Sequence, residues 1–217
     1  MGLSDQQIER YARQIIVPGI GGIAQERLLS ARLMLTGKAA DLATVLAYLV
    51  GAGVGEIRLQ LPASDAAEQE SLIIRAAQLN PEVVVKPGAD NIAGLNLVFA
   101  IGGGSEASEL IVQLLGKGVA LIFVRLDEPA TIAILPAAPP CLACADADLL
   151  RPLNRCGDNA GFVAMIAATE AFKLLAYAAP TPAPALLQFS GFASATRELR
   201  QNPVLAKCAC SIATQKQ

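Results

Sequence analysis

The chain has 217 residues, which is enough for a single domain or for one domain with a small appendage. Hydrophobic residues make up 53% of it, so it can bury a sizeable core, and its net charge of −2 argues against nucleic-acid binding. The absence of histidine excludes histidine-dependent catalytic pairs and histidine metal ligands. The polar N-terminus lacks a signal-peptide apolar region, and no unbroken apolar run reaches membrane-span length, so a cytoplasmic protein with no membrane partner is predicted.

The first 30 residues are predicted to form two helices. Ser4 or Asp5 can cap the first helix, whose apolar residues recur at helical spacing until a Pro-Gly pair breaks it. A second, short helix over about residues 24–30 leads into the first strand. We therefore expect an N-terminal helical segment, residues 1–30, followed by an α/β domain over residues 31–217.

A strand, a turn, a helix and a second strand are predicted over residues 31–61. Arg32–Thr36 is a short apolar run that ends in Gly37, and apolar residues at helical spacing follow it. A cluster of glycines ends that helix, and alternation of apolar with polar residues then indicates a strand. Such a unit, with a right-handed crossover, begins a doubly wound sheet in which the ligand lies at the first strand-to-helix turn.

The rest of the chain alternates strands with helices, as in an α/β fold. Further strands are predicted at residues 82–86, 95–101, 119–124 and 131–135, helices at about 65–79, between 104 and 116, and at 160–178, and a final hairpin at 185–191 and 193–200. Ser64 is a candidate cap for the 65–79 helix. The predicted fold is a doubly wound, Rossmann-like α/β domain with a mostly parallel sheet, a C-terminal antiparallel extension and a cysteine-tethered tail.

The first strand-to-helix turn, from Gly37 to Leu42, decides the question of nucleotide binding. A phosphate-binding turn needs glycines for the bend and for close backbone approach, and only Gly37 is present here. Asp41 is predicted to cap the helix, where its carboxylate would take the amide donors of an anion and repel phosphate, partly offset by Lys38. The turn is either a weakened nucleotide site that includes Gly37 and Lys38 or a plain connection, and the second interpretation is favoured.

Several strings of the sequence resemble the MoeB/ThiF/HesA family, whose members are related to ubiquitin-activating enzymes. Residues 4–35 look like the family's N-terminal signature, with its arginine-tyrosine-any-arginine-glutamine motif as Arg10-Tyr11-Ala12-Arg13-Gln14. Gly53-Val54-Gly55, Leu79-Asn80-Pro81 and a terminal Arg-Gln-Asn-Pro string followed by cysteines also fit. The resemblance spans nearly the whole chain. It implies ATP- and magnesium-dependent adenylation of the C-terminal glycine of a ubiquitin-like or sulfur-carrier protein, usually by a dimer.

The chain departs from this family pattern at five features of the nucleotide pocket. The glycine turn is degraded, and the segment that carries the phosphate-contacting Asn and Arg is missing. The family's ribose-binding acidic residue, its lysine and its metal-binding aspartate fall on Leu61, near Glu68 and on Gly103. Adenylation requires cations and donors around the phosphates, so these losses predict a degenerate member without self-sufficient adenylation, in which ATP and magnesium binding is doubtful.

One functional residue of the family is retained as Arg13, which matches an arginine that reaches into the neighbouring subunit's ATP site. Either this chain donates Arg13 to an active paralogue in a heterodimer, or Arg13 is a solvated or ion-paired helix residue. The predicted function is that of a pseudoenzyme, acting as a subunit of a homodimer or heterodimer or as a binding module for a carrier protein. Two alternatives stay open: an active adenylyltransferase with a rearranged pocket, and a cysteine-based sulfur-handling protein.

Four of the five cysteines form two pairs that suit a structural zinc ion. Cys141-x-x-Cys144 places two thiolates in a tight turn, as along one edge of a tetrahedral zinc site. By the family's pattern the second pair comes from the tail, here Cys208 and Cys210, which are separated by one residue where the family has two. We predict a four-cysteine zinc site that tethers the tail, with a vacant reduced site or a disulfide as the alternatives.

Cys156 lies just before the last long helix, where some relatives use a cysteine for thioester, persulfide or acyl-disulfide chemistry. Arg155 and the helix N-terminus favour the thiolate, whereas Asp158 opposes it. Cys156 is therefore either a reactive thiol or a passive residue, and a lone cysteine is more often passive.

Overall fold

The computed structural model describes residues 2–88, 92–103, 114, 117–137, 160–177, 184–191 and 193–198. Its strands within these ranges are β1 (Arg32–Thr36), β2 (Glu56–Gln60), β3 (Val84–Pro87), β4 (Leu97–Ile101), β5 (Ala120–Arg125), β6 (Ala130–Leu135), β7 (Ala185–Ser190) and β8 (Ala193–Glu198). They form one sheet in the order β3-β2-β1-β4-β5-β6-β7-β8. The pairs from β3 to β5 are parallel and those from β5 to β8 antiparallel, so the predicted doubly wound sheet with an antiparallel extension is confirmed.

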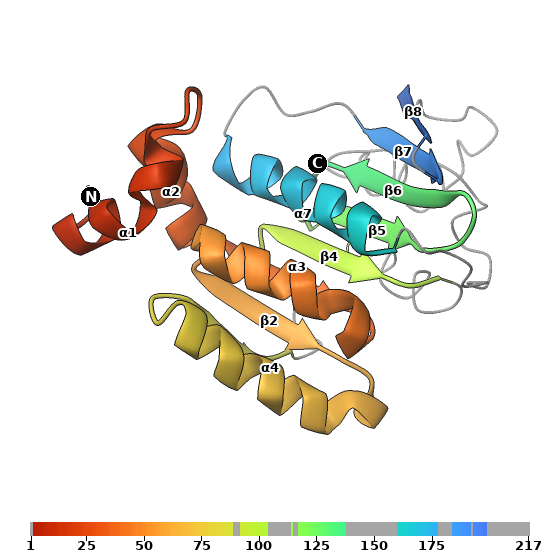
Figure 1. Ribbon diagram of the computed structural model, residues 1–217, viewed down its shortest axis with the longest axis horizontal. Coiled ribbons are helices and arrows are strands. Elements are labelled where there is room, and N and C mark those ends of the chain that lie inside the picture. Colours follow the sequence, from red (N-terminus) through yellow and green to blue (C-terminus); the bar gives the residue numbers. More distant parts are fainter. Residues whose placement is uncertain are drawn as a thin grey trace.

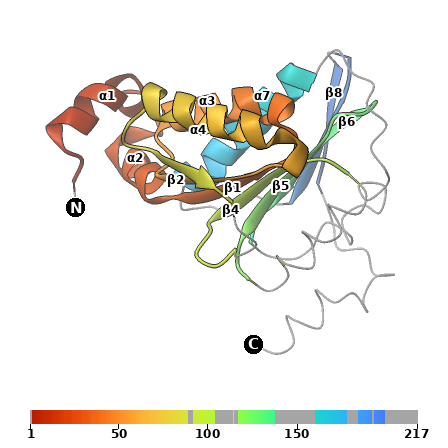
Figure 2. The ribbon, with the colours of Figure 1, turned by 90° about the horizontal axis from the view of Figure 1, so that it is seen from below.

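The helices of the described residues are α1 (Asp5–Ile15), α2 (Gly21–Ser30), α3 (Ala39–Ala52), α4 (Ala66–Leu79) and α7 (Ala160–Ala176), with a short 3-10 turn η1 (Ala63–Asp65) before α4. Figures 1 and 2 show α3, α4 and α7 together on one face of the sheet, with α1 and α2 beyond one end of it. Helix α3 packs against both α4 and α7. No helix in these ranges is both long and apolar enough to cross a membrane.

The core lies on both faces of the central strands, because side chains alternate along a strand. In β1, Leu33 and Leu35 belong to the cluster under the helices, whereas Met34 belongs to the cluster on the opposite face. Every residue of β4, β5 and β6 is buried, as in strands covered on both sides. The short strand β2 instead alternates buried with half-buried residues, so its second face is polar.

Helix α1 begins as predicted at Ser4, whose hydroxyl accepts a hydrogen bond from the Gln7 amide, while the Gln7 side chain accepts one from the Ser4 amide. This reciprocal capping box satisfies two amides that the first turn would leave without partners. The amphipathic helix then buries Tyr11 and leaves Ile8 and Ile16 largely exposed.

A buried polar network fixes α1 to the C-terminal end of α3. The Asn80 side-chain amide donates to the Tyr11 hydroxyl and to the Val50 carbonyl, both at 2.9 Å. The Gln25 side-chain amide donates to the Ala52 carbonyl at 3.0 Å. These side chains therefore satisfy carbonyls that the last turn of a helix leaves without intrahelical partners.

Gly53 ends α3 in the left-handed conformation, with φ of 86°. A Cβ atom at this position would lie 2.7 Å from the Tyr11 ring and 2.8 Å from the Gln25 side-chain nitrogen. Only glycine therefore allows both the turn and the close approach of α1.

The predicted helix between residues 104 and 116 lies outside the described residues except at Leu114. The side chains of residues 194–198 and all residues from 199 onward lie outside them too. The division into residues 1–30 and 31–217 stays a prediction.

Candidate anion site at the start of helix α3

The candidate site lies at the carboxyl ends of the parallel strands, where β1 has β2 on one side and β4 on the other. The connection through α3 runs to β2, and later crossovers run to the other side of β1, so this is the switch point at which doubly wound sheets bind ligands. The turn from β1 into α3 passes through Gly37 and Lys38, and the helix begins at Ala39.

Gly37 is required by packing against β4. Its φ is +145°, and a Cβ atom there would lie 2.7 Å from the Ile101 carbonyl oxygen. A larger residue would push apart the ends of two adjacent strands. Packing against β4 therefore explains why residue 37 is glycine, without a bound phosphate.

The side chain of Asp65 occupies the start of α3. Its Oδ2 atom accepts a hydrogen bond from the Ala39 amide at 2.8 Å, and its Oδ1 atom accepts one from the Ser64 hydroxyl at 2.8 Å. The first amides of a helix are the donors that bound phosphates use in this fold class. The carboxylate of η1 therefore stands where an anionic ligand would be held.

The pKa of Asp65 is lowered by the same hydrogen bonds. The Ala39 amide, the Ser64 hydroxyl and the positive charge of Lys38 together hold the pKa of this carboxyl below its ordinary value of 3.8. The group is therefore ionised at neutral pH. Lys38, which is exposed, faces a carboxylate of its own chain at this turn.

Two predicted caps are wrong, and Asp65 explains both. The helix begins at Ala39, so Asp41 is its third residue and not its cap; the cap position is Lys38, which gives no side-chain cap bond. Ser64 does not cap α4 either, because its hydroxyl donates to Asp65. The signal that sequence analysis missed is a Ser-Asp pair just beyond β2, which spacing alone cannot connect with a helix 26 residues earlier.

Three other residues occupy positions of the nucleotide pocket that the family resemblance implies. Leu61, in place of the ribose-binding acid, packs against the core and donates its backbone amide to the Gln69 side chain at 3.2 Å. Glu68 lies exposed in the first turn of α4. Gly103, in place of the metal-binding aspartate, follows β4 and is half-buried.

Arg13 lies far from this turn. It is exposed on α1, next to Gln14, whose side chain donates to the Ala52 carbonyl at the last residue of α3. The turn is at the other end of this helix, which with 14 residues spans about 20 Å. The structure therefore does not bring Arg13 together with Gly37 and Lys38 of the same chain.

All five cysteines lie outside the described residues. The zinc ligands Cys141, Cys144, Cys208 and Cys210 and the candidate thiol Cys156 therefore stay predictions. Within the described ranges, no group of three or more Cys, Asp or Glu side chains is placed to hold a metal ion.

Comparison with known proteins bears on the class of this fold. The vegetative HesA protein of Trichormus variabilis is 29% identical over 81% of this chain and 78% of its own length. The molybdopterin-synthase adenylyltransferase of Salmonella typhimurium is 27% identical over 95% of this chain and 98% of its own. The adenylyltransferase and sulfurtransferase uba4 of Neosartorya fischeri is 26% identical over 96% of this chain and 51% of its own. No family model matches the sequence.

Solved structures agree at the level of the fold. E. coli MccB crystallised with selenomethionine MccA superposes with a TM-score of 0.70 and 15% identity, over 96% of this chain and 75% of that one. E. coli MccB with ATP gives a TM-score of 0.69 and 15% identity, over 93% of this chain and 74% of that one. The chain thus shares the α/β architecture of MccB. The sequence matches, at 26–29% identity, agree with the resemblance to the MoeB/ThiF/HesA family.

Proposed function

We propose that this chain is a degenerate member of the family that does not adenylate a carrier protein by itself. The observation that carries the proposal is the Asp65 carboxylate, bound to the Ala39 amide where a phosphate would bind. For ATP to use that amide, the carboxylate would have to leave, and if it stayed nearby it would repel the phosphates. Leu61 and Gly103 supply no carboxylate for the ribose or the metal ion, and Glu68 supplies no cation where the family has its lysine.

The proposal is tested by nucleotide binding. We expect calorimetry of the wild-type chain with ATP and magnesium to show no binding, and pyrophosphate exchange with a carrier protein to stay at background. The Salmonella adenylyltransferase named above is the positive control for both assays. Micromolar affinity for ATP, or exchange that depends on a carrier protein, would contradict the proposal and establish an active adenylyltransferase with a rearranged pocket.

The working role of the chain, in this proposal, is that of a partner subunit. Arg13 is exposed and lies near the end of α3 opposite its own turn, with a helix of about 20 Å between them, so its guanidinium is available to another chain and not to this turn. An arginine supplied by a second subunit stabilises the charge that develops on transferred phosphates. The partner would be an active paralogue, and the substrate of the pair a ubiquitin-like or sulfur-carrier protein.

Mixing experiments test this role. A candidate active paralogue is assayed for adenylation alone, with wild-type chain and with Arg13→Ala. We expect the wild-type chain to raise adenylation and Arg13→Ala to lose that increase. Arg10→Ala, which removes a neighbouring exposed cation of the same helix, is the matched control and should behave as wild type. Equal adenylation with wild type and Arg13→Ala would end the idea.

The cysteines supply two separate tests. We propose that Cys141, Cys144, Cys208 and Cys210 hold one structural zinc per chain, since a closed four-thiolate site leaves no position for water. Metal analysis of protein purified without chelator should find stoichiometric zinc, and its absence would contradict the site.

If Cys156 is reactive, it should be alkylated faster than a free thiol, and Cys156→Ser should lose function while keeping zinc.

A further inference from the structure

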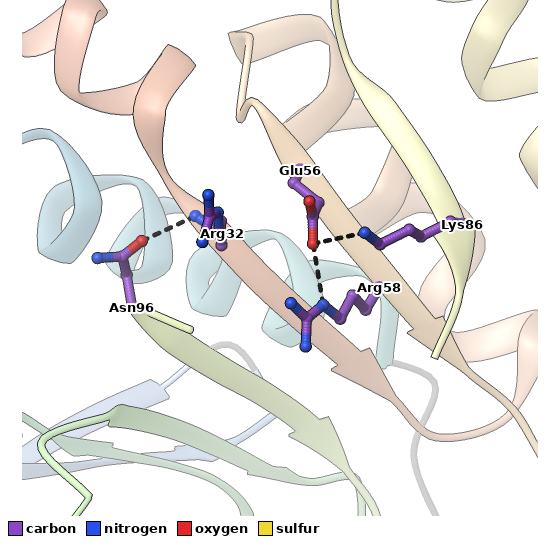
Figure 3. Close-up of polar contacts among 5 residues, drawn as sticks. All are labelled: Arg32, Glu56, Arg58, Lys86 and Asn96. Carbon is purple, nitrogen blue, oxygen red and sulfur yellow. Dashed lines mark hydrogen bonds and ion pairs between the residues drawn. The ribbon is translucent and has the colours of Figure 1, made fainter. Parts of the chain in front are cut away.

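A group of charged side chains crosses three adjacent strands on the sheet face opposite α3 and α4. Arg32 of β1, Glu56 and Arg58 of β2 and Lys86 of β3 form this group, which is called the basic strip below (Figure 3). Arg32 is the register partner of Glu56, and Arg58 is the register partner of Lys86. Arg58 is also paired with Met34, which belongs to the cluster on the face away from the helices. All four side chains therefore share that face.

Glu56 organises the strip. Its Oε1 atom accepts from the Arg58 Nε at 2.9 Å and from the Lys86 Nζ at 3.0 Å. These two bonds hold the pKa of Glu56 below its ordinary value of 4.5, so the carboxylate is charged at neutral pH. It separates two cations that would otherwise repel each other across adjacent strands. One carboxylate is thus shared by Arg58 and Lys86.

Arg32 contributes a cation outside this arrangement. Its backbone amide donates to the Asn96 side chain at 2.8 Å, which fixes the start of β1. Its guanidinium forms no ion pair with any residue in the described ranges. The strip therefore presents Arg32 on one side and the partly exposed Lys86, whose side chain is 46% exposed, on the other.

The two ends of the strip are accessible, since Arg32 is exposed and the Lys86 side chain is 46% exposed, whereas the side chains of Glu56 and Arg58 between them are only 22% and 15% exposed. Helices α3, α4 and α7 lie on the other face, and in the described ranges no helix lies over β1, β2 and β3 on this side (Figure 2). Val84, on the edge strand in the same row as Arg32 and Glu56, is 55% exposed. By contrast, the residues of β4 and β5 on this face are buried in a second apolar cluster.

We propose that the basic strip is a docking surface for an acidic segment of a partner protein. Strands lie about 4.8 Å apart and rise about 3.3 Å per residue, so the backbones that carry Arg32 and Lys86 are separated by about 12 Å. In an extended acidic segment, carboxylates four residues apart on one face are separated by about 13 Å. Two such carboxylates can pair with Arg32 and Lys86 at once.

The mixed charge of the strip favours a protein over a nucleic acid. Glu56 lies between the cations and would repel a continuous line of phosphates, whereas a protein surface can place carboxylates on either side of it. The chain as a whole has a net charge of −2, which opposes binding to any uniform polyanion. The inference does not depend on the function proposed above.

Binding of a labelled peptide tests the docking surface. The probe is an extended peptide with glutamate at every fourth position, and its affinity for the full chain is measured by fluorescence anisotropy at low and high salt. We expect binding that weakens with salt and that falls about 10-fold in Arg32→Glu/Lys86→Glu, since charge pairs at the rim of an interface dominate its salt dependence. The affinity of the milder variant Arg32→Gln/Lys86→Gln should fall less. This variant keeps the test valid if the first variant misfolds.

A matched charge reversal on the helical face is the control. Arg75→Glu/Lys173→Glu makes the same change in net charge on α4 and α7 and should keep wild-type affinity. No binding by wild type, or an equal loss in this control, would overturn the proposal. Tighter binding of duplex DNA than of the peptide, abolished by Arg32→Glu/Lys86→Glu, would overturn it in favour of a nucleic-acid surface.

Discussion

The two ends of helix α3 carry polar contacts of opposite kinds. At its C-terminal end, Tyr11, Gln25 and Asn80 are almost fully buried. Asn80 donates to the Tyr11 hydroxyl, and Asn80 and Gln25 donate to carbonyls of the last turn of α3, so every group in these bonds is neutral. At its N-terminal end, a single charged group, Asp65, bonds to the Ala39 amide from a turn that is only partly covered. The first end holds two helices in place, whereas at the second end a side chain bonds to an amide of the kind that binds ligands in this fold class.

This difference separates structure from function within one helix. A buried neutral network cannot be exchanged for solvent without loss of stability, because each unpaired group then lacks a partner. The half-buried Asp65 carboxylate lies closer to solvent, so water can replace its bonds and their loss costs less stability. We therefore expect changes at the C-terminal end to act on folding and changes at the N-terminal end to act on ligand recognition.

The largest effect is expected for Gly53→Ala. The new Cβ atom would meet Tyr11 and Gln25 below 3 Å, in a backbone conformation that alanine disfavours. We expect a loss of about 3 kcal/mol in the free energy of unfolding, measured by urea denaturation. Gly51→Ala is the matched control: this helical glycine has open space around its Cβ position, so alanine there should stabilise the protein.

Asn80→Ala should have the next largest effect. It removes the donor to both the Tyr11 hydroxyl and the Val50 carbonyl in a buried site, and we expect a loss of about 2 kcal/mol in urea denaturation. Asn96→Ala removes an amide from an exposed position and should lose clearly less. An equal loss in the free energy of unfolding in the two variants would show that burial does not strengthen the hydrogen bonds of Asn80.

Tyr11→Phe should act mainly at alkaline pH. Burial raises the pKa of Tyr11 above its ordinary value of 10.0, so the folded state favours the neutral phenol. This stability is fully present below pH 10 and falls as pH rises through the folded-state pKa. We expect a loss of about 1 kcal/mol at neutral pH and a smaller alkaline decline than in wild type. Tyr48→Phe, at a residue 61% exposed, should keep the wild-type profile.

The smallest effect on stability is expected for Asp65→Asn, and it should appear at acidic pH. The folded-state pKa is lowered, so this contribution is present above the ordinary value of 3.8 and is lost as pH falls through the folded-state pKa. Thermal unfolding between pH 2 and pH 5 should therefore change less with pH in the variant. Glu68→Gln, at an exposed residue of α4, is the control and should follow wild type. If the melting temperatures of wild type and Asp65→Asn changed equally with pH, the bond between the Asp65 carboxylate and the Ala39 amide would contribute nothing to stability.

The sequence predicted what depends on local pattern. The Arg32–Thr36 strand, the helix that follows it and a cap at Ser4 or Asp5, of which the structure shows Ser4, were within reach of spacing and residue type. The contacts that define the two ends of α3 were not, because Tyr11 and Asn80 are 69 residues apart and Ala39 and Asp65 are 26 apart. The sequence predicted that the Asp41 carboxylate bonds to the first amides of this helix, whereas the carboxylate that accepts from the Ala39 amide is Asp65, which comes from the next connection of the fold.

The length of α3 sets a rule for how copies of such a fold can cooperate. Helix α3 lies between Arg13 and the turn at Gly37 and Lys38, so in the proposed role a chain would donate Arg13 at one end and receive a partner's arginine at the other. If two copies of this chain paired with each other, each Arg13 would meet a turn at which the Asp65 carboxylate of the other copy already bonds to the Ala39 amide. Paired with an intact paralogue, the same chain would complete one centre and leave its own silent, so such a complex would turn over at one site for every two chains.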